Sequence, residues 1–113
     1  MRGFNEVWIS GNVGSKIVIG KTKDDRPCCS WSVASENEKH RLTWARVNAY
    51  DALAEYCNDM LEKGVYCSVV GELMNRGGQY GELTEIRAQQ VVFHKVPDSS
   101  VNQEAYSDEP EGA

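Results

Sequence analysis

Apolar and polar residues alternate along most of this chain, a pattern typical of strands that bury one face. The alternation predicts five strands, over residues 4–14, 28–35, 42–50, 65–73 and 82–94. Residues 17–19 continue the first strand beyond a glycine-containing bend. In the second strand, Cys29, Trp31 and Val33 share the face that the alternation assigns to the core.

One segment follows a helical period instead. Leu53, Cys57 and Met60 recur at helical spacing, which predicts a helix over residues 51–63. Asp51 is a suitable N-cap, and Gly64 provides a stop. Two polar, turn-forming segments at residues 21–27 and 75–81 connect neighbouring strands.

The predicted order is three strands, one helix and a two-stranded hairpin. This is the order of the OB-fold, a five-stranded Greek-key barrel with a helix between strands three and four. We therefore expect an all-β domain with one helix over residues 1–96. Barrels of this class bind oligonucleotides or oligosaccharides on the face of strands two and three and on neighbouring loops.

Charge is distributed unevenly along the chain, whose formal net charge is −5. Residues 97–113 contain five of the 17 acidic residues and none of the 12 basic ones, which leaves residues 1–96 neutral. Few apolar residues occur there, so we expect a disordered acidic tail. A neutral body permits a local basic groove for nucleic acid but does not demand one.

The third strand carries the clearest candidate chemistry. Trp44, Arg46 and Tyr50 are two and four positions apart, so they project from one side of the sheet. Bases stack on aromatic rings and guanidinium groups bind phosphates, so this spacing suits single-stranded nucleic acid. A half-exposed ladder of cross-strand pairs is the plainer alternative.

Other chemistries find little support in the sequence. Cys28 and Cys29 are adjacent, and Cys57 and Cys67 lie in apolar patterns, so buried thiols are favoured over disulfides or zinc ligands. Phosphate-binding loops, nucleophile motifs and two-metal carboxylate clusters are absent, so we expect no enzyme, no cofactor and no metal. Neither a membrane span nor a signal peptide is evident, which favours a cytoplasmic location.

The chain resembles the bacterial single-stranded DNA-binding protein family. The resemblance rests on three groups of residues in a fixed order between residues 2 and 93: 2–7 with 11–14; 43–47 with 53–55 and 63–64; 69–73 with 84–86. It implies sequence-tolerant binding that protects single-stranded DNA during replication, recombination and repair. The protein would then be associated with the nucleoid or be encoded by a phage.

The resemblance also assigns roles to particular residues. Trp44 and Tyr50 match aromatic positions that stack on bases, and Arg2, Arg46 and Arg76 match basic positions near the DNA path. The family forms homo-oligomers, so a dimer or tetramer is expected. Its acidic tail docks replication and repair proteins, a role that here falls to Asp108, Glu109 and Glu111.

Three more aromatic residues complete the set of candidate DNA contacts. Tyr80 lies at a hairpin tip, where it has no packing role. Trp8 suits a core or subunit contact as well as it suits stacking. Trp31 is included although its alternation with Val33 favours the core. The ambiguous cations, which charge alone does not assign to DNA, are Lys21, Lys23, Arg41 and Arg87.

The chain departs from the family pattern at several positions. Ala45 replaces a histidine that supports subunit contacts, Glu6 replaces a lysine, and the tail lacks a terminal phenylalanine. These departures keep open a second function, an OB-fold protein-interaction module of a replication or recombination assembly without DNA affinity of its own. An RNA-binding cold-shock-like domain would need a denser aromatic cluster on strands two and three.

Overall fold

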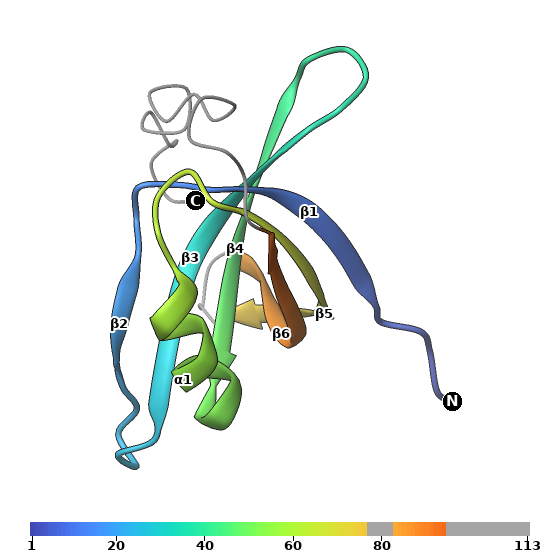
Figure 1. The fold of residues 1–113 in the computed structure, drawn as a ribbon. Coiled ribbons are helices and arrows are strands. Elements are labelled where there is room, and N and C mark those ends of the chain that lie inside the picture. The colour runs from blue at the N-terminus through green and yellow to red at the C-terminus, as the bar shows by residue number, and fades with distance from the viewer. Residues whose placement is uncertain (77–82, 95–113) are drawn as a thin grey trace.

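A computed structural model describes residues 1–76 and 83–94 of the chain, which form a closed β-barrel with one helix (Figure 1). The strands are β1 (Val7–Val13), β2 (Val18–Lys21), β3 (Pro27–Glu36), β4 (Leu42–Tyr50), β5 (Tyr66–Arg76) and β6 (Leu83–His94). The helix α1 (Asp51–Met60) lies between β4 and β5. The predicted bounds of β4 agree with the structure, and the other strands differ from the prediction by one to three residues at their ends.

The pairing of the strands confirms the predicted OB-fold. Neighbours follow the order β1-β5-β6-β4-β3-β2, and a further pairing of β1 with β3 closes the barrel. Strand β4 runs parallel to β6, whereas the other pairs are antiparallel. Because β1 and β2 pair with successive parts of β3, they act as the single bent strand that the sequence predicts.

Gly11 allows the barrel to close. A β-carbon at this position would lie 2.2 Å from the carbonyl oxygen of Ala34 on β3, a distance that no side chain tolerates. The missing side chain therefore lets the backbones of β1 and β3 approach at the seam, where Asn12 pairs with Ala34.

The core fills the barrel with the inward-facing residues of each strand. The fully buried members include Val13, Trp31, Val33, Val47 and Val69. Trp31 is the largest of them, and its ring centroid lies 6.3 Å from that of Phe93. Since Trp31 has 0% of its surface exposed, it is a core residue, and its inclusion among the DNA contacts is wrong. The strand period, which pairs Trp31 with Val33, had indicated this burial.

The helix departs from the prediction at both ends. Tyr50 is the N-cap, and Asp51 is instead the first helical residue, with its carboxylate bonded to Arg26. The helix ends at Met60 rather than Lys63. The following segment turns away and pairs with the end of β1: Gly64 N donates to Val13 O, and Val13 N donates to Val65 O.

The cysteines are free thiols. Cys29, Cys57 and Cys67 are buried, as predicted, whereas Cys28 is only half-buried. The Cys29 thiol on β3 donates to the carbonyl oxygen of Ala54 on α1 at 4.0 Å. The proximity of the Cys29 and Cys57 thiols lowers the pKa of Cys29 and raises that of Cys57. Burial raises the pKa of the Cys67 thiol to about 11. The three buried thiols serve as small apolar residues, and Cys29 on β3 and Cys57 on α1 belong to the core that joins the helix to the barrel.

Candidate nucleic-acid interface

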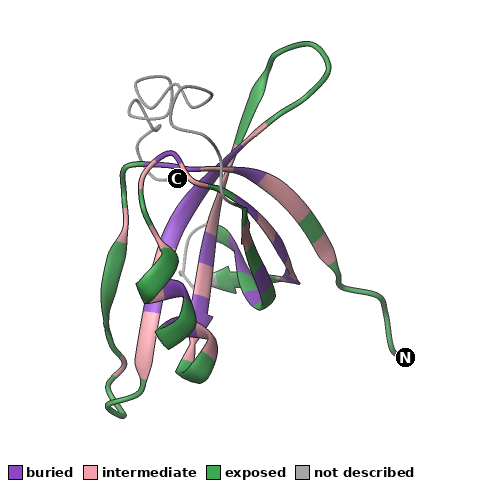
Figure 2. Ribbon diagram, in the orientation of Figure 1, coloured by how far each residue is buried: buried purple, intermediate pink, exposed green. Residues whose placement is uncertain are grey.

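The outer face of β4 carries the aromatic and basic residues that the sequence singles out. Val47 and Ala49 are fully buried in the core, so the alternating residues Trp44, Arg46 and Tyr50 project outward, as the strand period predicts. All three are half-buried (Figure 2 colours such positions pink along β4). They form a row with Asn48 along one wall of the barrel, which we call the β4 face.

Arg46 is held in place by acceptors of the protein itself. Its Nη1 donates to the carbonyl oxygen of Lys16 at 2.8 Å and to the Ser32 hydroxyl at 3.1 Å. Its Nη2 donates to the Ser30 hydroxyl at 2.9 Å. Ser30 and Ser32 lie directly across from Asn48 and Arg46 in the pairing of β3 with β4. The guanidinium thus fastens the segment between β1 and β2 onto the β4 face.

Strand β6 adds two charged residues to this face. The carboxylate of Glu85, which is 8% exposed, accepts a hydrogen bond of 2.8 Å from the Asn48 side chain. The exposed guanidinium of Arg87 lies 5.4 Å from the centre of the Tyr50 ring, within the range of a cation–π contact. The parallel pairing of β4 with β6 places Asn48 opposite Arg87 and so brings these residues together.

Sequence reasoning left Arg87 unassigned and did not select Asn48 or Glu85. Their alternation marks Arg87 as an outward residue, but nothing in the sequence states which strand lies beside β6. The contact with Tyr50 depends on a parallel pairing between strands separated by the helix and β5. The OB-fold pairs β4 with β6, and applying this pairing in the correct register to the predicted strands would have placed Arg87 beside Asn48.

The other predicted DNA contacts lie elsewhere or outside the described residues. Arg2 is exposed in the segment that precedes β1. Arg76 is the last residue of β5, and its side chain lies outside the described part of the chain. Tyr80 and the tail residues, which include Asp108, also lie outside the described residues.

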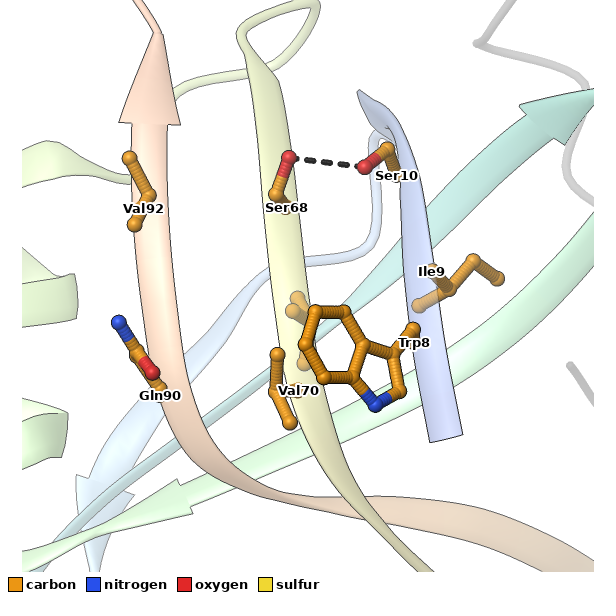
Figure 3. Close-up of a pocket in the computed structure, with 8 residues that line it drawn as sticks. Trp8, Ile9, Ser10, Ser68, Val70, Gln90 and Val92 are labelled. Carbon is orange, nitrogen blue, oxygen red and sulfur yellow. Dashed lines mark hydrogen bonds between the residues drawn. The ribbon is translucent and has the colours of Figure 1, made fainter. Parts of the chain in front are cut away.

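Trp8 is on a different wall of the barrel. It projects from β1, has 74% of its surface exposed, and its indole N–H donates to the carboxylate of Glu6. Beside it is a shallow pocket of about 480 Å³ over β1, β5 and β6, shown in Figure 3. The residues lining the pocket carry no charge: Trp8, Ile9, Ser10, Ser68, Val69, Val70, Gln90 and Val92.

A chain of hydrogen bonds continues across this second wall. Ser10 and Ser68 share a hydrogen bond of 2.8 Å, and the Ser68 hydroxyl lies 3.0 Å from Nε2 of His94 (Figure 3 shows the first of these). Tyr66 packs on the His94 ring with the centroids 5.6 Å apart. Trp8 therefore belongs to a surface separate from the β4 face, with a pocket that has no charged lining residue.

Neither a metal site nor a membrane-spanning helix is found in residues 1–76 and 83–94. No group of three or more histidine, cysteine, aspartate or glutamate side chains there is placed to hold a metal ion. The helix in this part of the chain is too short and too polar to cross a membrane.

Comparisons with known proteins agree with this geometry. A model of the single-strand binding protein family matches residues 4–96. No curated protein matches the sequence. Among solved structures, a deletion mutant of the single-stranded DNA binding protein from Thermus aquaticus is similar, with a TM-score of 0.69 and 25% identity. The match covers 84% of this chain and 44% of that one, so this chain spans less than half the length of its structural relative.

Proposed function

The chain belongs to the single-strand binding protein family, and from this premise we propose that it binds single-stranded DNA on the β4 face. The observation that carries the proposal is the shared outward projection of Trp44 and Tyr50, with the Arg87 guanidinium 5.4 Å from the Tyr50 ring. Every base has a flat face that stacks on an aromatic ring, so binding tolerates any sequence. Such binding would protect single strands during replication, recombination and repair.

Arg46 has two roles in this proposal. Its hydrogen bonds to Lys16, Ser30 and Ser32 keep the segment between β1 and β2 against the β4 face. Its positive charge lies between Trp44 and Tyr50, where it attracts the phosphates that connect two stacked bases. A positioning role and an electrostatic role are compatible because the hydrogen bonds leave the charge at the surface of the strand.

The binding proposal is tested by titrating the full chain into fluorescein-labelled oligo-dT and following anisotropy at several salt concentrations. We expect saturable binding whose log affinity falls with log salt, with a slope of about −0.7 for each phosphate contacted. Duplex DNA of equal length should bind much more weakly, because its bases are already stacked. An absence of binding at low salt would support the protein-interaction module instead.

We also propose that the chain forms homo-oligomers through the wall that carries Trp8. Trp8 and Val92 are 74% and 43% exposed, and the pocket between them has no charged lining residue. The β1 backbone from Val7 to Gly11 pairs with β5 on one side. Among residues 1–76 and 83–94, its other side pairs with β3 at Asn12 and Val13 alone. An apolar face beside an open strand edge is suited to a second copy of the chain. Ala45 packs against the core and does not contribute to this surface.

Light scattering on a sizing column tests this interface. We expect wild-type particles of at least twice the 12.6 kDa chain mass, and a shift to monomers in Trp8→Glu. Tyr56→Glu is the matched control, because Tyr56 is 43% exposed on α1 and does not line the pocket. A monomeric wild type, or a Trp8→Glu variant that keeps the wild-type mass, would contradict the proposal.

The acidic residues Asp108, Glu109 and Glu111 supply the third element of the proposal. They lie outside the described residues, and their concentration of negative charge supports docking of basic surfaces on replication or repair proteins. A cytoplasmic location follows from such partners.

A further inference from the structure

Arg26 and Asp51 form a two-point ion pair beside Tyr50. Arg26 Nε donates to Asp51 Oδ1 at 2.8 Å, and Nη2 donates to Oδ2 at 2.6 Å. The two side chains are 47% and 53% exposed. A guanidinium binds phosphate through the same pair of parallel hydrogen bonds. The carboxylate therefore fills a position that a phosphate also fits, and water reaches it.

The backbone holds Asp51 in an unusual conformation at this position. Its φ is 59°, in the left-handed region that residues other than glycine seldom adopt. No capping side chain donates or accepts a hydrogen bond at the start of α1. The Asp51 carboxylate accepts hydrogen bonds from Arg26 instead. Because such a conformation is unfavourable, it persists only where surrounding contacts maintain it, and the Arg26 pair is the contact that the structure shows.

A second guanidinium acts on the same carboxylate. The pKa of Asp51 is lowered first by its hydrogen bond with Arg26 and further by the positive charges of Arg26 and Arg87. Arg87 also lies 5.4 Å from the centre of the Tyr50 ring. Arg26 precedes β3 and Arg87 belongs to β6. The fold thus brings one cation onto Asp51 and another onto the ring of its chain neighbour Tyr50, from distant segments.

We propose that Arg26 and Arg87 form a phosphate-binding site beside Tyr50, and that Asp51 occupies the phosphate position in the free protein. The proposal rests on the binding of single-stranded DNA to the β4 face. When a base stacks on Tyr50, the phosphate of the same nucleotide, or of the next one along the strand, lies near Arg26 and Arg87. Arg26 then donates its two hydrogen bonds to two phosphate oxygens instead of to the Asp51 carboxylate. The Asp51 side chain rotates into the solvent. Asp51 thereby acts as an internal competitor that moderates affinity for DNA.

The test compares Asp51→Asn with Asp25→Asn in the full chain. Asp25 is a close match for Asp51: its φ is 61°, its side chain is 83% exposed, and it pairs with a cation, Lys21, at 3.4 Å. Asparagine tolerates left-handed backbone, so both variants lose one negative charge without new strain. We expect Asp51→Asn to bind labelled oligo-dT about two- to fivefold more tightly at low salt, the size of effect that an exposed ion pair produces.

The salt dependence gives a second readout. Once Asp51 is neutral, a solution anion accompanies Arg26 in the free protein. It is released on binding together with the cations released from the DNA, so the slope of log affinity against log salt becomes steeper than in the wild type. Asp25→Asn should leave the slope unchanged. The gain should also disappear when Arg26→Ala is added to Asp51→Asn. A gain that survives this addition would come from net charge alone and would overturn the proposal.

The remaining outcomes distinguish the phosphate-site proposal from the proposal that single-stranded DNA binds to the β4 face. If the wild type binds oligo-dT and Asp51→Asn behaves like Asp25→Asn, the phosphate site is wrong and DNA binding stands. If the wild type does not bind, both are wrong. Asp51→Gly, in which the left-handed backbone is unstrained, provides a folded alternative should circular dichroism show that Asp51→Asn is unfolded. It is expected to show the same gain in affinity.

Discussion

Replacing both Trp44 and Tyr50 by alanine is expected to weaken binding to oligo-dT by about 30-fold or more. Each base stacked on an aromatic ring contributes about 1–3 kcal/mol, so the loss of two platforms removes at least about 2 kcal/mol. The change leaves the core intact, since both side chains project outward between buried residues of β4. Anisotropy of labelled oligo-dT measures the loss, and each single variant should lose roughly half of the binding free energy at stake.

Tyr56→Ala provides the control for this measurement. Tyr56 is an exposed aromatic residue on α1 that packs against Phe93, away from the β4 face. Its removal tests whether any surface aromatic residue affects binding. Equal losses for Tyr56→Ala and Tyr50→Ala, or wild-type affinity in the double variant, would show that DNA follows another path on the barrel.

Trp31→Ala is expected to lower the free energy of unfolding by about 3–5 kcal/mol, the usual cost of deleting a large aromatic side chain from a core. Trp31 is fully buried and packs near Phe93, so alanine leaves a cavity that the rigid strands around it cannot fill. Trp31→Phe keeps most of the volume and should cost much less. Urea denaturation followed by far-ultraviolet circular dichroism measures both.

This prediction also separates a core residue from a DNA contact. A folded Trp31→Ala protein should retain its affinity for oligo-dT, apart from the fraction that is unfolded. A variant with wild-type stability and a large loss of affinity would reverse the assignment of Trp31 to the core.

Much of the fold follows from local patterns in the sequence. The alternation in residues 42–50 predicts the bounds of β4 and places Trp44 and Tyr50 on one side, because a strand has a period of two. The helix ends were less well predicted. Asp51 has the composition of an N-cap, but its carboxylate bonds to Arg26, which precedes it by 25 residues. Contacts between distant residues override local preference in this way.

In the candidate interface, too, local spacing predicts some residues, and contacts between distant strands determine the others. Residues on one strand could be assigned to one face from spacing alone, as with Trp44, Arg46 and Tyr50. Residues from different strands could not, since the cluster around Tyr50 requires the parallel pairing that sets Asn48 beside Arg87. The hydrogen bonds of Arg46 to Ser30 and Ser32 likewise depend on the register between β3 and β4.

The burial of Trp31 also determines how this protein emits light. Of its three tryptophans, one is sealed in an apolar core, one lies on the wall with the neutral pocket, and one lies on the β4 face. A nucleotide that stacks on Trp44 quenches that indole alone. Trp31 then contributes a constant emission at short wavelength, which remains in the residual spectrum at saturating DNA. The wavelength of that residual spectrum, rather than the total intensity, distinguishes occupancy of the β4 face from unfolding, which shifts the emission of Trp31 to the red.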